Sequence, residues 1–196
     1  MANILLSAKD IKIRFGGVIA ADGISLDVLE GENLAIIGPN GAGKTTFLNV
    51  STGYLRPQAG TVSFLGQDIT TKLPRTITKL GIARAFQIPQ LFLDQTVMEN
   101  MLIAAASRRG NPSGFQALSR LPDLPDMERL LDLVGVRSYA QRKARELPEG
   151  QRKLVDIALA LALKPKLLLM DEPTSGVASS EKLEIMDILT LSLIHI

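Results

Sequence analysis

The chain has 196 residues, of which 46% are hydrophobic, and it is long enough to bury a substantial core in one domain or two tightly joined subdomains. Its formal net charge of +2 is small, and its basic residues are scattered apart from Arg108-Arg109 and Arg142–Arg145, for which a solvated surface is favoured over a face that binds nucleic acid or lipid headgroups. It has no cysteine, which excludes disulfides and thiolate chemistry, and no apolar stretch approaches a membrane span of roughly 18–20 residues.

The first part of the chain predicts a small antiparallel sheet. Ile4–Ile13 and Ile24–Val28 have the composition of strands. Turns are indicated by three pairs that contain glycine: Gly16-Gly17, Asp22-Gly23 and Glu30-Gly31. Phe15 precedes the first of these turns. Its position is equally consistent with an ordinary packed aromatic and with a stacking platform for an adenine base.

The segment Gly38–Thr46, G-P-N-G-A-G-K-T-T, fits the phosphate-binding pattern G-x-x-x-x-G-K-[ST]. Asn33–Ile37 predicts a buried strand before it, and Thr46–Thr52 predicts the opening of a helix after it. Glycines let backbone N–H groups surround a phosphate, while Lys44 reaches the terminal phosphates and Thr45 supplies a hydroxyl for Mg²⁺. The helix dipole favours the same anion. A polyphosphate is the expected ligand, and the alternative is a glycine turn without a nucleotide. The residues expected to line this loop are Gly38, Pro39, Asn40, Gly41, Ala42, Gly43, Lys44, Thr45 and Thr46.

After the first helix, the chain predicts further strands. Arg56–Gly60 has loop composition, Thr61–Leu65 predicts a strand, and Gly66–Asp68 predicts a turn. Gly81–Phe86 predicts another short strand, which ends at Gln87. A polar side chain in that position suits a role in binding Mg²⁺ and the attacking water. The alternative is a loop amide that satisfies backbone groups.

The following region predicts helices. Thr96–Ala106 has helical composition, and its first residue lies at capping-box spacing from Glu99. Ser107–Pro125 is rich in Arg, Gly, Pro, Ser and Asn, which predicts a long loop. Met127–Val134 has the 3.6-residue period of a packed helix, and Gly135 is expected to end it.

A second group of polar residues follows a buried strand. Leu147–Gln151 interrupts the chain before Arg152–Leu163, a strongly apolar segment that predicts a buried helix. Leu167–Met170 predicts a strand covered on both faces, which delivers Asp171 and Glu172 at its carboxyl end. Asp171 is a candidate for holding Mg²⁺ through water, and Glu172 for polarising the attacking water. The alternative is a helix cap.

Together, Gly38–Thr46, Leu147–Gln151 and Leu169–Thr174 resemble the nucleotide-binding domain of ABC transporters over nearly the whole chain. Three further segments are most similar to the ATPase subunits of branched-chain amino acid importers: R-F-G-G at Arg14–Gly17, A-F-Q at Ala85–Gln87 and D-E-P-T-S-G-V at Asp171–Val177.

The resemblance implies an α/β fold of the P-loop NTPase type, with an antiparallel N-terminal sheet, a mostly parallel core sheet and an inserted helical subdomain. Residues 1–90 and 151–190 would form the nucleotide-binding core, and residues 91–150 the helical subdomain. The implied activity is ATP hydrolysis with Mg²⁺, powering import of branched-chain or related amino acids. Alternatives are a lipid-extracting or exporter-type ABC ATPase, and a soluble ABC protein without a transport role.

The resemblance also implies roles for particular residues. Phe15 would stack on adenine, Gln87 would sense the γ-phosphate, and Lys44, Gln87 and Glu172 would act in catalysis. Thr45, Gln87 and Asp171 would hold Mg²⁺. The family signature would comprise Leu147, Pro148, Glu149, Gly150 and Gln151, and would cap the ATP bound by a second ATPase subunit in a head-to-tail pair.

The implied partners are membrane permease subunits, that second ATPase subunit and, indirectly, a periplasmic or extracellular solute-binding protein, with no nucleic acid. The implied location is the cytoplasmic face of the cell membrane, reached through the permease.

Three residues depart from the family pattern: Pro148 replaces a serine, Glu149 a glycine and Ala178 an aspartate. We expect the chain to hydrolyse ATP despite these changes, but at an altered rate.

The last residues predict one more helix, Ser180–Leu189, followed by Leu191–Ile196, which contains the single histidine, His195. By the resemblance, the switch histidine of the family lies well downstream of the D-loop, which is Ser175–Ala178 here, and the interval from that loop to His195 is too short. The six final residues are what the start of a transposase sequencing adapter encodes. We therefore expect the natural sequence to depart from this one after about Thr190, and the shortened chain to hydrolyse ATP poorly.

Overall fold

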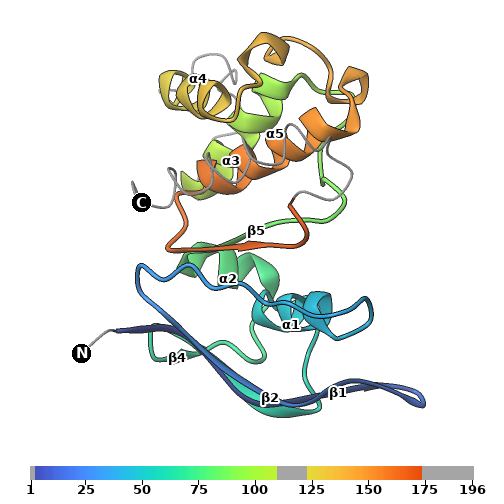
Figure 1. The fold of residues 1–196 in the computed structure, drawn as a ribbon. Coiled ribbons are helices and arrows are strands. Elements are labelled where there is room, and N and C mark those ends of the chain that lie inside the picture. The colour runs from blue at the N-terminus through green and yellow to red at the C-terminus, as the bar shows by residue number, and fades with distance from the viewer. Residues whose placement is uncertain (1–2, 110–122, 174–196) are drawn as a thin grey trace. The chain divides into compact units, whose positions relative to one another are not determined.

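The computed structural model describes residues 3–109 and 123–173 of the chain. They belong to two compact units, Met1–Ile82 and Ala83–Ile196 (Figure 1). The predicted helix Ser180–Leu189, Ala178 and the final segment Leu191–Ile196 lie outside the described residues.

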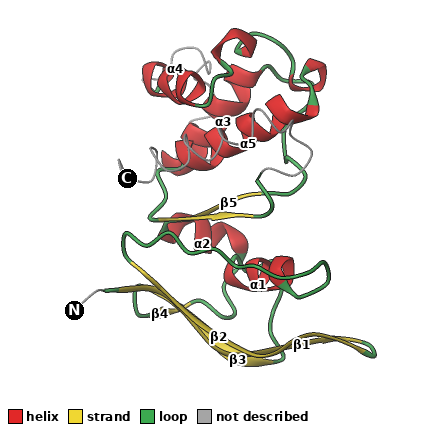
Figure 2. Ribbon diagram, viewed as in Figure 1, coloured by secondary structure: helices red, strands yellow, loops and turns green. Residues whose placement is uncertain are grey.

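The first unit contains a four-stranded sheet in the order β2-β1-β3-β4, in which all neighbouring strands are antiparallel. Its strands are β1 (Ile4–Phe15), β2 (Val18–Leu29), β3 (Ala59–Phe64) and β4 (Gln67–Asp68). Figure 2 shows β1 and β2 as a long hairpin. The predicted antiparallel sheet is therefore confirmed, together with the turn at Gly16-Gly17.

The prediction of a turn at Asp22-Gly23 is wrong, because both residues lie inside β2. The pairs Ile11–Ile24 and Lys12–Asp22 leave Gly23 as an extra residue, with a φ of +81°. A glycine in the left-handed region inside a strand is typical of a β-bulge, which a turn-forming pair resembles in sequence.

Two helices complete the core of the first unit: α1 (Lys44–Ser51) and α2 (Pro74–Leu80). The core is formed by buried apolar side chains of the sheet and of both helices, among them Leu6, Ile11, Val62, Phe64, Phe47, Val50 and Ile77. Sequence analysis missed α2, although Pro74 at its start and Gly81 (φ +113°) at its end are typical helix boundaries.

The prediction of a buried strand at Asn33–Ile37 is wrong for the described structure. The segment has no regular secondary structure, and Ile37 is 93% exposed. An apolar run of this kind needs neighbouring strands to bond its backbone. The sheet of the first unit consists of β2, β1, β3 and β4, and Asn33–Ile37 does not join it.

The second unit combines a helical cluster with a two-stranded sheet, β5-β6. Its described elements are β5 (Ile82–Ala85), all but the first residue of which belong to this unit, α3 (Val97–Arg109), α4 (Leu124–Leu133), the 3-10 turns η2 (Arg137–Tyr139) and η3 (Ala144–Glu146), α5 (Glu149–Ala162) and β6 (Leu167–Met170). Helices α3, α4 and α5 share one buried apolar cluster. None of the helices within residues 3–109 and 123–173 is long and apolar enough to cross a membrane.

Several predicted boundaries in this unit are confirmed. Thr96 and Glu99 form the capping box of α3: the Thr96 backbone N–H donates to Glu99 at 2.7 Å, and the Glu99 N–H donates to Thr96 at 3.1 Å. Gly135 (φ +71°) follows the end of α4, and β6 has the predicted bounds.

The predicted loop Ser107–Pro125 is too long at both ends, because α3 continues to Arg109 and α4 begins at Leu124. Residues 110–122 lie outside the described part. Helix α5 begins at Glu149, three residues before the predicted start at Arg152. The last three residues of the Leu147–Gln151 motif are therefore helical.

Candidate nucleotide site

In the first unit, the backbone of the phosphate loop requires glycine at Gly43, which is the N-cap of α1 and has a φ of +87°. A Cβ atom there would lie 2.3 Å from the carbonyl oxygen of Ala20. Ala20 is itself an extra residue in β2, between the pairs Ile13–Ala21 and Arg14–Ile19. The bulged strand and the loop thus approach each other too closely for any side chain at Gly43.

The ammonium group of Lys44 folds back over this loop. Its Nζ donates hydrogen bonds to the carbonyl oxygens of Gly38 at 2.7 Å and Pro39 at 3.0 Å. No acidic residue lies in the first turn of α1, where Thr45 and Thr46 follow Lys44. The amino end of α1 therefore combines a positive dipole end with a lysine, and its donors fit a phosphate group.

Phe15 ends β1 and is 52% exposed. This exposure is inconsistent with a fully packed core aromatic, one of the two interpretations left open by the sequence. Its stacking on adenine stays a prediction.

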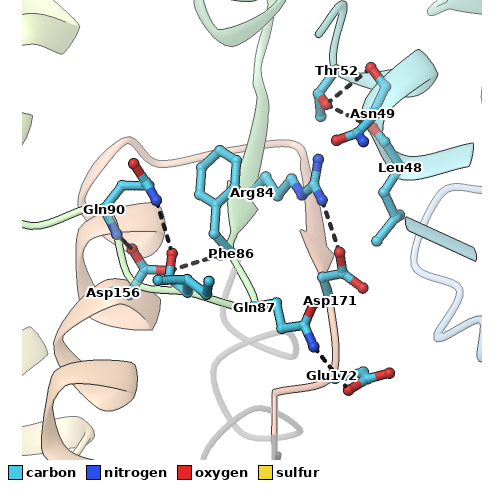
Figure 3. Close-up of polar contacts among 11 residues, drawn as sticks. Leu48, Asn49, Thr52, Arg84, Phe86, Gln87, Gln90, Asp156, Asp171 and Glu172 are labelled. Carbon is cyan, nitrogen blue, oxygen red and sulfur yellow. Dashed lines mark hydrogen bonds and ion pairs between the residues drawn. The ribbon is translucent and has the colours of Figure 1, made fainter. Parts of the chain in front are cut away.

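In the second unit, the residues that follow β5 and β6 lie together (Figure 3). The backbone N–H of Asp171 donates to the carbonyl oxygen of Ala85 at 3.3 Å, which joins the carboxyl ends of the two strands. The Nε2 group of Gln87 donates to Oε2 of Glu172 at 3.4 Å, and both side chains are exposed. The second unit therefore brings two predicted catalytic side chains within hydrogen-bonding distance.

Asp171 forms a buried ion pair with Arg84, an arginine that sequence analysis missed. Arg84 Nη2 lies 2.8 Å from Asp171 Oδ2, and the two side chains are 5% and 3% exposed. The guanidinium also lies over the ring of Phe86, 4.8 Å from its centroid. Such a pair fixes the orientation of the Asp171 carboxylate. The available signal was a cation inside the otherwise apolar strand Ile82–Ala85.

Carboxylate, hydroxyl and amide oxygens are the ligand types that Mg²⁺ prefers, so the donor set of Thr45, Gln87 and Asp171 fits the predicted ion. Thr45 belongs to the first unit, and Gln87 and Asp171 to the second. A shared metal site for these three residues stays a prediction.

Glu172 has an unusual backbone for a residue that is not glycine, with a φ of +48°. Its carbonyl oxygen accepts a hydrogen bond from Lys153 Nζ at 3.4 Å. Non-glycine residues in the left-handed region cost free energy and are frequent at functional sites. Lys153 thus attaches helix α5 to this strained position.

Asp156 of α5 was also missed, and it contacts the segment around Gln87. Its two carboxylate oxygens accept the backbone N–H groups of Phe86 at 2.7 Å and Gln90 at 3.2 Å. Asp156 is 5% exposed, and burial raises the pKa of its carboxyl group to about 6, against the opposing effects of the two N–H donors and of Lys153. The signal in the sequence was a carboxylate within a strongly apolar helix.

The Leu147–Gln151 motif forms the start of α5. Leu147 is buried, Pro148 is the N-cap, and no side chain caps the helix at that position. The first-turn backbone N–H groups and the helix dipole therefore suit an anion, against the opposing negative charge of Glu149 in the same turn. A pocket of about 290 Å³ adjoins this turn and is lined by Ile88, Pro89, Gln90, Leu91, Leu93, Glu149 and Arg152.

Comparison with known proteins decides the family, because residues 21–175 match the ABC transporter family over more than half of the chain. The chain belongs to the ABC transporter family. Its fold is accordingly that of an ABC-type P-loop NTPase, and the chain is a nucleotide-binding subunit with ATPase activity.

Named relatives extend over most of the chain. The chain is 40% identical to the probable branched-chain amino acid transport ATP-binding protein LivG of Methanocaldococcus jannaschii, over 89% of this chain and 70% of that protein. It is 32% identical to the high-affinity branched-chain amino acid transport ATP-binding protein LivG of Escherichia coli, over 96% and 77%.

Solved structures agree with this assignment. An ATP-binding cassette of an ABC transporter is similar with a TM-score of 0.85 and 36% identity, over 98% of this chain and 78% of that chain. Its ADP conformation is similar with a TM-score of 0.82.

Proposed function

We propose that the chain powers the import of branched-chain or related amino acids through a membrane permease, at the cytoplasmic face of the cell membrane. The names of its relatives from Methanocaldococcus jannaschii and Escherichia coli support this substrate class. In this proposal the permease subunits hold the chain at the membrane, and a periplasmic or extracellular solute-binding protein delivers the amino acid.

The proposed nucleotide site combines the phosphate loop and Phe15 with the residues that follow β5 and β6. Backbone N–H groups of Gly38–Thr46 bind the phosphates, Lys44 contacts the terminal phosphates, and Phe15 stacks on the base. Mg²⁺, held by Thr45, Gln87 and Asp171, would neutralise charge on the phosphates.

The observation that carries the catalytic assignment is the 3.4 Å contact between Gln87 and Glu172 at the ends of β5 and β6. In the proposed reaction Glu172 accepts a proton from the attacking water, and Gln87 orients that water through its side-chain amide. Both roles require exposed polar atoms at the same point, which the two side chains provide.

The second half of each site would come from another ATPase subunit, identical or related, in a head-to-tail pair. The uncapped first turn of α5, with Pro148, Glu149, Gly150 and Gln151, would then face the γ-phosphate bound by the neighbour. Residues 1–90 and 151–190 would act as the nucleotide-binding core, and residues 91–150 as the helical part that contacts the permease.

The variant Glu172→Gln tests this assignment. We expect it to bind ATP as the unchanged chain does, but to turn over at least about 10²-fold more slowly, because only the proton acceptor of the transition state is removed. Binding is measured with a fluorescent ATP analogue, and turnover by phosphate release. Lys44→Ala serves as the contrasting variant and should weaken binding itself. Equal turnover of Glu172→Gln and the unchanged chain would reject the role given to Glu172.

A further inference from the structure

The side chain of Asp156 attaches helix α5 to the segment that carries Gln87. Asp156 binds the backbone on both sides of Gln87, with Oδ2 accepting the Phe86 N–H at 2.7 Å and Oδ1 accepting the Gln90 N–H at 3.2 Å (Figure 3). Each carboxylate oxygen thus holds one end of a five-residue segment. The Gln87 side chain projects from the second residue of this segment toward Glu172.

A buried carboxylate of this kind is costly unless its oxygens are bonded. Asp156 lies on the buried face of α5, among apolar neighbours such as Val155 and Ile157. The two backbone N–H groups offset part of the cost of its burial, and charge-assisted bonds of this type are about twice as strong as neutral ones. Removing the carboxylate would also leave two backbone donors without their acceptor.

The same helix also reaches the residue after β6. Lys153 precedes Asp156 by three positions, which places both on one side of α5. Its Nζ donates to the carbonyl oxygen of Glu172 at 3.4 Å, where the backbone has its positive φ. Helix α5 therefore contacts the backbone next to Gln87 and the backbone of Glu172.

We propose that Asp156 is a positioning residue that fixes Gln87 to helix α5, so that the Gln87 segment and the Leu147–Gln151 turn at the start of that helix move as one body. Lys153 likewise fixes the backbone of Glu172 to helix α5 through its hydrogen bond to the Glu172 carbonyl oxygen. This inference rests on the proposed function of Gln87 and Glu172. A nucleotide captured by the first turn of α5 would then displace Gln87 together with the helix. Neither Asp156 nor Lys153 touches the nucleotide in this scheme.

The first test measures amide hydrogen exchange of Phe86 and Gln90 in the unchanged chain and in Asp156→Ala. We expect both amides to exchange at least about tenfold faster in the variant, because their acceptor is gone. The matched control is Val155→Ala, which removes fully buried methyl groups from the adjacent position of α5. It should lower the melting temperature without accelerating exchange at Phe86 and Gln90. Unchanged protection in Asp156→Ala, or equal acceleration in the control, would overturn the inference.

The second test separates positioning from a general loss of structure. Asp156→Ala should lower the kcat of ATP hydrolysis at least about tenfold while changing KM for ATP less than about threefold, since the phosphate loop is intact. Asp156→Asn keeps one acceptor oxygen and should retain an intermediate kcat. Val155→Ala should keep the kcat of the unchanged chain. If kcat does not fall in Asp156→Ala, the inference is overturned. An unchanged chain that neither binds nor hydrolyses ATP would instead reject the proposed function. In that case, and equally if the turnover of the unchanged chain is too low to measure, the exchange experiment decides the role of Asp156.

Discussion

The phosphate loop can adopt its observed conformation because Gly43 has no Cβ atom. The left-handed φ excludes alanine, and so does the Ala20 carbonyl oxygen, which would lie only 2.3 Å from a Cβ atom at this position. We expect Gly43→Ala to weaken ATP binding at least about tenfold, because the loop must shift before it can accommodate the side chain. Titration with a fluorescent ATP analogue measures this change.

The matched control for this variant is Gly17→Ala. Gly17 has no positive φ, and nothing lies within 4 Å of a Cβ at that position. ATP affinity in Gly17→Ala should equal that of the unchanged chain. Unaltered affinity in Gly43→Ala would show that the close contact with Ala20 does not shape the loop.

Asp156 predicts an unusual dependence of stability on pH. Burial raises its pKa from 3.8 to about 6, so the folded state holds this proton more tightly than the unfolded state does. Its contribution to the free energy of unfolding is therefore complete below about pH 4 and is lost as the pH rises through about 6. A shift of this size corresponds to about 3 kcal/mol.

Comparison with Asp156→Asn isolates this effect, because the other carboxylates contribute equally to both proteins. Relative to the asparagine variant, the unchanged chain should lose up to about 3 kcal/mol of unfolding free energy between about pH 4 and pH 7. Urea denaturation followed by circular dichroism measures the difference. A difference that is the same at both pH values would contradict the raised pKa.

Among the elements, the start of α5 shows how the departures from the family signature are accommodated. Pro148 is the N-cap, a position where serine commonly accepts a hydrogen bond from a first-turn N–H group. If backbone N–H groups and the helix dipole bind the γ-phosphate, Pro148→Ser should change turnover by less than about tenfold. A several-hundredfold gain in phosphate release would show that Pro148 is a true defect.

Local patterns predict some elements well. Strand β6 has the bounds expected from the sequence, because Leu167–Met170 is a continuous apolar run that ends at an acidic pair. The capping box at Thr96 also identifies the start of α3. Other elements depend on their surroundings. Asn33–Ile37 is also mostly apolar but joins no sheet of the first unit. Gly150 lies within α5 although glycine usually weakens a helix.

Some residues of the candidate site can likewise be predicted from the local sequence, and others depend on distant partners. Gln87, Asp171 and Glu172 can be identified from their places at the ends of predicted strands, and the second unit brings Gln87 and Glu172 together. Arg84 and Asp156 could not be assigned from the sequence, because their partners lie 87 and 70 positions away along the chain. A charged residue in an apolar element indicates that a buried partner exists, but the sequence does not identify that partner.

For the whole molecule, the proposed head-to-tail pair predicts complementation between inactive variants. Lys44→Ala damages the site that its own chain provides, and Gly150→Asp damages the signature that its chain offers to the neighbour. A mixed pair contains one site with both defects and one site with neither. We expect equimolar mixing to restore about a quarter of the phosphate release, since half of the pairs are mixed and each has one intact site.

Each variant alone provides the control, and both should hydrolyse ATP at background rates. The result depends on two chains sharing each site, and not on which amino acid is transported. The head-to-tail arrangement would be rejected if phosphate release does not recover in a mixture that is shown to contain pairs with one chain of each variant.

The bulge at Ala20 links the length of a surface hairpin to the phosphate loop. Strand β2 begins at Val18, directly after the Gly16-Gly17 turn, and the extra residue follows two positions later. A residue inserted into this turn that shifts the strand pairing would move a different carbonyl against Gly43 and turn every β2 side chain to the other face. We therefore expect evolution to tolerate substitutions in the turn but not insertions or deletions, so that hairpin length is inherited together with the nucleotide-binding motif.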